Sequence, residues 1–243
     1  MHVSNVSPSD SNLQQLSASS ALSVLDAAPV LEFEPLIRRM GLVEYEPTWS
    51  AMREANRTRT SETPDEFWLL AHPPVFTLGL AGKPEHVIAP GEIPVVRIDR
   101  GGQVTYHGPG QAVVYLMLDV RRLGYGVKEL VRRIEAAVIA LLADYAIDGF
   151  RREGMPGVYV ERHGRDAKIA AIGLRIANHA TYHGVSLNVD MDLAPFSCIN
   201  PCGYEGLAVT QLKDFGVGDN CNQAGEKLVT HLVESIYGTK ANG

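Results

Sequence analysis

Cysteine is scarce in this chain. Only three, Cys198, Cys202 and Cys221, occur among 243 residues. Three cysteines cannot all pair with one another, so their number argues against a disulfide framework and for a reducing compartment. The cytoplasm is therefore the expected location.

Long apolar runs and an early basic segment are also missing. No stretch approaches the roughly 18 apolar residues of a membrane span, and the 21% content of charged residues is ordinary for a soluble protein. The first lysine or arginine is Arg38, so we expect neither a secretory signal nor an organelle transit peptide. These features predict a protein without membrane contact.

Excess positive charge is absent as well. The formal net charge is −6, whereas nucleic-acid binding depends on clustered lysines and arginines that neutralise phosphates. We therefore expect no nucleic-acid partner. The arginines nevertheless occur in doublets, among them Arg121-Arg122, and such a doublet could form a local patch for an acidic protein partner.

The chain divides into a polar extension and one domain. Residues 1–28 are rich in Ser and Asn without a sustained apolar period, which predicts a disordered extension. Residues 29–243 contain no repeat and no polar linker, so we expect a single domain there. Strand-like and helix-like segments follow one another along it.

Periodicity predicts six strands and three helices. Short apolar runs bounded by turn residues predict strands at 67–71, 95–99, 112–120, 157–161, 168–176 and 185–189. Apolar residues at three- and four-residue steps predict helices over 130–145 and 228–236, and a third helix is expected over 48–59. Because strands and helices do not alternate strictly, the fold class is α+β, with a mixed sheet flanked by helices.

Cys202 and Lys168 stand out as candidate chemistry. Cys202 lies between Pro201 and Gly203, where a tight turn without bulky neighbours leaves the sulfur accessible. A free thiol with pKa about 8.5 is only a few per cent thiolate at neutral pH, and a nearby ammonium would favour the thiolate. The pair could therefore supply a nucleophile together with its acid and base.

Two further segments indicate a binding surface. Residues 100–111 carry four glycines interleaved with polar side chains and are expected to form a loop between two strands; such glycines let backbone N–H groups approach a ligand. Residues 72–79 are expected to form a second, proline-extended loop, apolar enough to line a hydrocarbon pocket. Residues 72–79 could equally be a rigid connection, whereas the polar side chains among the glycines favour a binding wall for residues 100–111.

Two other site chemistries remain open. Cys198, Cys202 and Cys221, with His179 and His183, could ligate zinc, although the second ligand pair is irregular for a structural site. A cysteine–histidine hydrolase is also conceivable, with His107 or His183 as the base.

Five segments together resemble the lipoyl(octanoyl) transferases of lipoate synthesis. They are residues 69–79, 100–111, 168–173, 183–189 and 196–203, in the order and spacing of that family. The resemblance runs from about Val30 to the C-terminus. It implies a fold similar to that of lipoate and biotin protein ligases.

The resemblance also implies an activity and its site. The expected reaction moves an octanoyl group from acyl carrier protein to a lysine on lipoyl domains of 2-oxoacid dehydrogenases and on the glycine cleavage H protein, without a cofactor or a metal. Cys202 corresponds to the nucleophile that carries the acyl thioester, and Lys168 to the acid/base. The residues that correspond to substrate-contacting positions are Arg100, Gly101, Gly102, Gln103, Val104, Thr105, Tyr106, His107, Ala171, Ile172, Gly173, Gly184, Val185 and Ser186.

Two alternative functions belong to other classes. An ATP-dependent lipoate or biotin ligase would have the same fold and would not require Cys202. A catalytically silent module that binds lipoyl groups or acyl chains would contain an inert Cys202.

Overall fold

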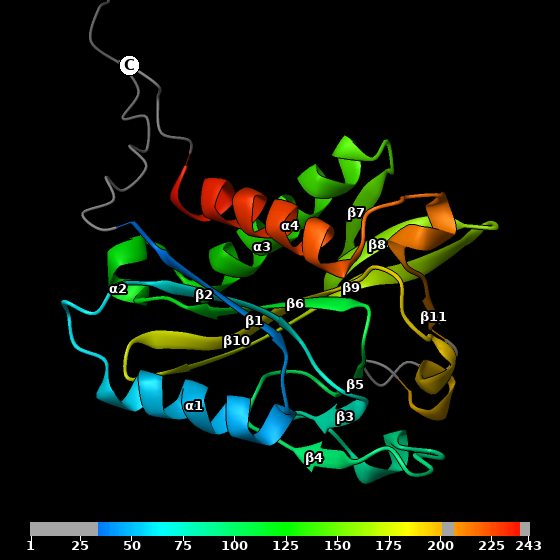
Figure 1. The fold of residues 1–243 in the computed structure, drawn as a ribbon, viewed down its shortest axis with the longest axis horizontal. Coiled ribbons are helices and arrows are strands. Elements are labelled where there is room, and N and C mark those ends of the chain that lie inside the picture. Colours follow the sequence, from blue (N-terminus) through cyan, green and yellow to red (C-terminus); the bar gives the residue numbers. More distant parts are fainter. Residues whose placement is uncertain (1–33, 201–206, 239–243) are drawn as a thin grey trace, which may run out of the picture.

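An eight-stranded mixed sheet forms the middle of the structure (Figure 1). The structure is a computed structural model that describes residues 34–200 and 207–238, so the expected extension over residues 1–28 and Cys202 lie outside the described residues. The strands of this sheet are β1 (Leu36–Leu42), β2 (Glu66–Ala71), β6 (Gln111–Met117), β7 (Gly149–Arg152), β8 (Met155–Arg162), β9 (Arg165–Ala177), β10 (Ala180–Asn188) and β11 (Ala208–Val209).

The sheet is mixed because two strands run parallel to their neighbours. The strand order is β1-β2-β6-β10-β9-β8-β7; β1 pairs with β2 in parallel, and β11 pairs with β9 in parallel. The remaining neighbours are antiparallel. The hairpin of β9 and β10 thereby lies in the centre, between β8 and β6.

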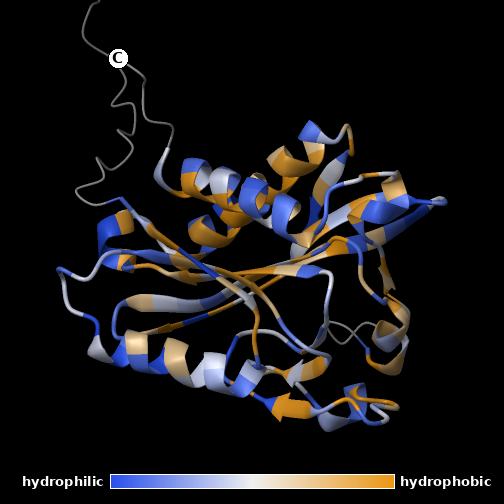
Figure 2. Cartoon of the chain, in the orientation of Figure 1, coloured by the Kyte–Doolittle hydropathy of each residue, from blue (hydrophilic) through white to orange (hydrophobic). Residues whose placement is uncertain are grey.

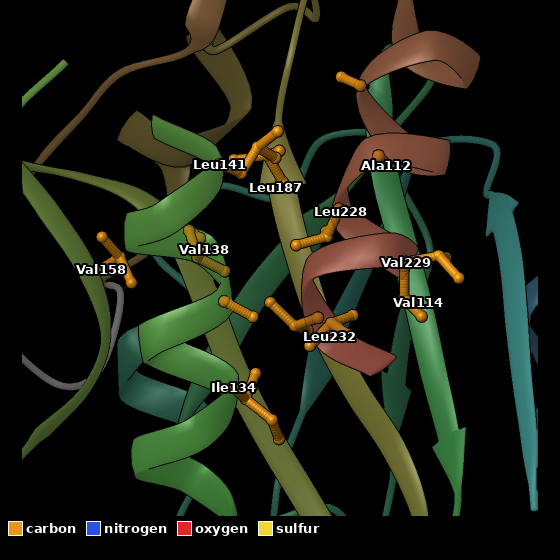
Figure 3. Close-up of a cluster of buried hydrophobic side chains, with 14 of the residues drawn as sticks. Ala112, Val114, Ile134, Val138, Leu141, Val158, Leu187, Leu228, Val229 and Leu232 are labelled. Atoms are coloured by element: carbon orange, nitrogen blue, oxygen red, sulfur yellow. The ribbon is translucent and has the colours of Figure 1, made fainter. Parts of the chain in front are cut away.

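Two helices cover one face of this sheet. They are α3 (Val127–Asp144) and α4 (Cys221–Tyr237), and both lie above the sheet in Figure 1. Their apolar stripes pack on the strands in one continuous core, which includes Leu141 and Leu228 from the helices and Leu187 from the sheet (Figure 3). A capping box at Asn220 and Gln223 satisfies backbone N–H groups at the start of α4.

The other face carries a helix and a small sheet. Helix α1 (Tyr45–Thr58) and the three-stranded sheet of β3 (Val75–Leu78), β4 (Val95–Arg97) and β5 (Val104–His107) lie below the large sheet in Figure 1. The buried residues of α1 are Tyr45, Thr48, Met52 and Asn56, at the spacing of one helix face. A short helix α2 (Val120–Leu123) follows β6.

Most of the predicted elements are present. The predicted strands correspond to β2, β4, β6, β8, β9 and β10, and the predicted helices to α1, α3 and α4. The two predicted loops were partly wrong, because residues 75–78 form β3 and residues 104–107 form β5. These two short segments pair with each other, with Val75 opposite His107, which gives their backbone groups partners that a loop would leave to water.

Hydropathy follows this arrangement. In Figure 2 the middle of the large sheet is mostly in the hydrophobic colour, the hairpin end of β8 and β9 is blue, and α3 and α4 show both colours. Within the described ranges, no helix combines the length and the apolar character that crossing a membrane requires.

Candidate active site

A pocket lies between the large sheet and the three-stranded sheet. Its walls come from β5, β6, β9 and β10, from the turn before β5, and from Tyr45 at the start of α1. Lys168, Arg100, His107 and His183 supply its cationic or titratable groups, and apolar residues such as Ile172 and Phe196 line it as well. An apolar pocket with a few convergent polar groups is the usual form of a small-ligand site.

Lys168 is buried at the wall of this pocket. Its ammonium Nζ donates to the carbonyl oxygen of Pro156 at 3.2 Å and lies 5.1 Å from the ring centroid of Tyr159. A strand irregularity directs it there: Val158 pairs with Ala170 and Tyr159 pairs with Lys168, so Ile169 is an extra residue on β9. Such a bulge changes the direction of neighbouring side chains. Here Ile169 belongs to the apolar core, Ala170 belongs to the core and also touches the pocket, and Lys168 lines the pocket.

Arg100 fixes the glycine turn before β5. Its Nη2 donates to the carbonyl and hydroxyl oxygens of Thr77 at 2.7 and 2.9 Å, and its Nη1 donates to the Gly101 carbonyl at 3.0 Å. The backbone of residues 79–81 hydrogen-bonds to the same turn, since the Leu80 N–H donates to the Arg100 carbonyl at 2.9 Å. The turn is therefore a fixed wall of the pocket.

A chain of buried hydrogen bonds joins two tyrosines and a histidine. His72 donates from Nδ1 to the Val43 carbonyl at 2.6 Å, because a carbonyl can only accept. Burial lowers the pKa of His72 to about 4, so at neutral pH its Nε2 accepts the hydroxyl proton of Tyr115 at 2.7 Å. The Tyr115 oxygen is then left to accept from Tyr45, to which it is hydrogen-bonded.

His107 is also neutral. Burial, more than any other cause, lowers the pKa of His107 to about 3. Its Nδ1 donates to the Gln111 side-chain oxygen at 2.7 Å, and the Gln111 amide donates in turn to Asn188 at 2.9 Å. This leaves Nε2 of His107 as a hydrogen-bond acceptor and a very weak base.

His183 combines a carboxylate partner with an unusual backbone. Its Nε2 lies 3.1 Å from Asp99, its φ is +61°, and its buried Nδ1 has no hydrogen-bond partner within the described part of the chain. Burial acts to raise the pKa of Asp99, but hydrogen bonds from His183, Tyr182 and Trp49 outweigh it and hold the pKa below its ordinary value. A left-handed φ in a residue other than glycine is a form of strain that is common at functional sites.

The pocket collects most of the predicted site residues. The predicted residues that line it are Arg100, Gly102, Gln103, Val104, Thr105, His107, Lys168, Ala171, Ile172, Gly173, Gly184, Val185 and Ser186. Gly101 and Tyr106 do not line it, because Gly101 donates its N–H to Leu174 and the Tyr106 ring packs against Phe76 and Phe196. Cys202 lies outside the described residues.

Other lining residues were not singled out in the sequence. Tyr45, Asn188 and Pro156 line the pocket. Tyr45 looks like the first apolar position of an amphipathic helix, and the contact of Pro156 with Lys168 is made by its backbone carbonyl. The polar side chain of Asn188 at the end of an apolar strand was the one available signal, because a polar group buried there needs a partner.

Gly184 has a packing reason of its own. A Cβ at this position would meet the Val114 carbonyl oxygen at 2.0 Å, so β10 and β6 can approach each other only with glycine there. Its place in the pocket wall and its close strand contact require the same small residue.

The described residues bear on the two alternative site chemistries. Both candidate hydrolase bases have lowered pKa values, mainly because of burial, and Lys168 lies in the same pocket. Among residues 34–200 and 207–238, no three His, Cys, Asp or Glu side chains are placed to hold a metal ion. Cys221 begins α4 and packs on the apolar core, away from His183.

The arginine doublet after β6 does not line the pocket. Arg121 pairs with Asp119 and Arg122 pairs with Asp65, at 2.6 and 3.0 Å. The doublet begins six residues after Tyr115, the last residue of β6 that lines the pocket, which is at most about 20 Å at about 3.3 Å per residue. Its part in a surface for an acidic carrier therefore stays a prediction.

Residues 44–233 match the family model described as the lipoyl protein ligase A/B catalytic domain. The chain belongs to this family. Among similar proteins of the family, an octanoyltransferase of Laribacter hongkongensis is 61% identical, over 81% of this chain and 93% of that protein. An octanoyltransferase of Dechloromonas aromatica is 58% identical, over 83% of this chain and 97% of that protein.

Solved structures of lipoate protein ligases share the fold. A bi-partite lipoate protein ligase from Thermoplasma acidophilum has a TM-score of 0.64 at 17% identity and covers 82% of this chain and 84% of that one. Lipoate-protein ligase A bound with ATP has a TM-score of 0.65 at 16% identity, with 84% and 85% covered. The expected family resemblance and the expected fold class are thus confirmed.

Proposed function

We propose that the chain transfers an octanoyl group from acyl carrier protein to a lysine of lipoyl domains, with Cys202 carrying the acyl group between them and Lys168 moving the protons. Octanoyl transfer in protein lipoylation follows from the family and from relatives named octanoyltransferase that are 54–61% identical over most of the chain. The single observation that supports the residue roles is Lys168, a buried ammonium at the wall of a largely apolar pocket.

The first half of the reaction loads the enzyme. The Cys202 thiolate attacks the carbonyl carbon of the octanoyl thioester, a carbon–sulfur bond forms, and the thiolate of the carrier's phosphopantetheine leaves. Lys168 gives that leaving thiolate a proton and becomes neutral. One thioester replaces another, so the step needs no ATP. The apolar residues of the pocket, Ile172 and Phe196 among them, would shield the acyl chain from water.

The second half passes the acyl group to the acceptor. The neutral amine of the target lysine attacks the Cys202 thioester, and the tetrahedral intermediate collapses to an amide with the Cys202 thiolate as leaving group. The neutral Lys168 accepts the proton that the attacking nitrogen loses. The enzyme then returns to the ammonium and thiolate with which it began, so protons and charge balance over the cycle.

The partners follow from the reaction. We infer that the donor is octanoyl-acyl carrier protein and that the acceptors are lipoyl domains of 2-oxoacid dehydrogenases and the glycine cleavage H protein. A thiol nucleophile must stay reduced, which is met in the cytoplasm, where we place the enzyme.

An assay of the two donors tests this function. The protein is mixed with a lipoyl domain and either octanoyl-acyl carrier protein without ATP, or free octanoate with ATP, and the acceptor lysine is followed by mass spectrometry. We expect octanoylation with the carrier-bound donor alone. Octanoylation only with ATP and octanoate would instead identify a ligase, and no product with either donor would favour a silent binding module.

A further inference from the structure

Helix α3 carries a buried carboxylate on its apolar side. Glu135 is a charged residue among the buried positions of α3, between Ile134 and Ala137. Burying a carboxylate is costly unless it is paired and hydrogen-bonded. A buried carboxylate on this helix face therefore calls for an explanation in terms of what it holds.

Two groups on neighbouring strands satisfy Glu135. Its Oε1 accepts the backbone N–H of Gly157 at 3.1 Å, and its Oε2 accepts from Nε of Arg151 at 3.0 Å. Arg151 is further held by the carbonyl of Arg132, one helical turn earlier on α3. The carboxylate thus links α3 to the start of β8.

The backbone that Glu135 holds is the backbone that Lys168 contacts. The N–H of Gly157 and the carbonyl of Pro156 belong to one planar peptide unit. Glu135 accepts from its N–H side, and the Lys168 ammonium donates to its carbonyl at 3.2 Å. Because the peptide is planar, fixing the N–H direction also fixes the direction of the carbonyl.

Gly157 lets the lysine stem pass this peptide. Its φ is +131°, and a Cβ there would lie 2.5 Å from the Ala170 carbonyl oxygen and 3.2 Å from Cε of Lys168. Gly157 has no side chain that could fix this peptide, so the peptide's conformation depends on external contacts, among them the pairing of Gly157 with Ala171 on β9. Glu135 supplies such a contact.

We propose that Glu135 is a positioning residue for Lys168, acting through the Pro156–Gly157 peptide. With the carboxylate in place, the Pro156 carbonyl points at the ammonium and holds it at the pocket wall. Without it, the peptide can turn and the ammonium loses this hydrogen bond to the Pro156 carbonyl. This inference rests on the proposed function, in which Lys168 works on the thiol and on the leaving group.

Steady-state transfer separates positioning from binding. A catalytic group displaced by 1 Å can cost about 100-fold, so Glu135→Ala is expected to lower kcat by about 10- to 100-fold with the KM for the octanoyl carrier unchanged. Glu135→Gln keeps an oxygen for the Gly157 N–H, so its kcat is expected to lie between those of the wild type and Glu135→Ala. Glu129→Gln is the control: Glu129 is on the same helix and is also paired with arginine, but its partners Arg132 and Arg133 belong to α3 itself.

A double-mutant cycle separates an effect of Glu135 through Lys168 from a general loss of packing around the pocket. The rate of Cys202 alkylation by iodoacetamide at neutral pH is measured by peptide mass spectrometry in the wild type, Glu135→Ala, Lys168→Ala and the double variant. Loss of a nearby ammonium leaves less thiolate, so both single variants are expected to react more slowly. If Glu135 acts through Lys168, the double variant reacts no more slowly than Lys168→Ala.

Each outcome has one meaning. An equal slowing by Glu135→Ala in both backgrounds, or a folded Glu135→Ala protein with unchanged kcat, overturns the positioning role alone. Unchanged alkylation and unchanged transfer in Lys168→Ala overturn the proposed roles of the lysine, and the inference about Glu135 then falls with them.

Discussion

The two faces of the eight-stranded sheet differ in what they bury. Toward α3 and α4 the strands present an apolar core that includes Val114 and Leu187 (Figure 3). Toward the three-stranded sheet, the neighbours of these residues in the sequence, Tyr115 and Ser186, line a pocket that also holds Lys168 and His107. Because side chains alternate along a strand, β6 and β10 contribute to the apolar core on one face and line the pocket on the other.

This difference separates two kinds of mutational effect. Replacing a pocket residue should change the rate of transfer more than the stability of the fold. Replacing a core residue should do the reverse.

Lys168→Met is expected to abolish most of the activity. Removing a general acid and base costs typically about 10²- to 10⁴-fold in rate, so octanoyl transfer should fall by about that factor, whereas the urea midpoint should change little. Lys213→Met is the control, because Lys213 pairs with Asp190 on the exposed surface. A Lys168→Met protein that transfers at the wild-type rate would contradict the account of the pocket face.

Leu141→Ala is expected to lower the stability of the fold and to leave the rate of transfer unchanged. Leu141 is fully buried in the core between α3 and the sheet. A cavity of this kind costs about 2–5 kcal/mol of unfolding free energy, measured by urea denaturation, and kcat per folded molecule should remain unchanged. Val127→Ala, at an exposed position of the same helix, should have little effect on stability. A fall in kcat that exceeds the loss of folded protein would show that the faces are not independent.

The neutral histidines of the pocket face should make stability fall in acid. The pKa of His107 is about 3 in the fold and about 6.5 when unfolded, so between these values the unfolded chain binds more protons. Stability is therefore full above pH 6.5 and falls as the pH decreases toward 3, by up to about 1.4 kcal/mol per pH unit for this histidine. His107→Gln should show a shallower slope in urea titrations from pH 7 to 4, and equal slopes would contradict this.

Exposed ion pairs outside both faces should have the smallest effect on stability and on the rate of transfer. Arg39 on β1 and Glu226 on α4 form an exposed pair, with Nε and Oε1 2.5 Å apart. Exposed pairs contribute little because water and salt screen them. Arg39→Met is expected to leave both the urea midpoint and the transfer rate at the wild-type values. A clear loss of either would mean that the β1 edge belongs to one of the two regions.

The sequence was sufficient for the elements with a regular apolar period. Helices α3 and α4 and strands such as β6 could be predicted because their core faces repeat regularly. Strands β3 and β5 could not, since each has four residues and follows prolines or glycines that are typical of loops. Their strand conformation comes from pairing with each other, which is a long-range contact.

The site could be predicted in part because several of its residues stand in recognisable sequence segments. Arg100, Lys168 and Ser186 stand in recognisable segments, and the fold brings those segments to one pocket. The direction of Lys168 depends on the extra residue Ile169, and a bulge of this kind leaves no periodic signal in the sequence. Glu135 resembles a surface residue of a helix until the packing of β8 is known.

The central claim, that the acyl group passes through Cys202, can be tested directly. The protein is incubated briefly with octanoyl-loaded acyl carrier protein and analysed by intact-mass and peptide mass spectrometry. The account predicts a hydroxylamine-labile octanoyl adduct on Cys202 that disappears when a lipoyl domain is added and that forms far more slowly in Lys168→Met. Octanoylation of the lipoyl domain without an adduct on Cys202 at any time would contradict it.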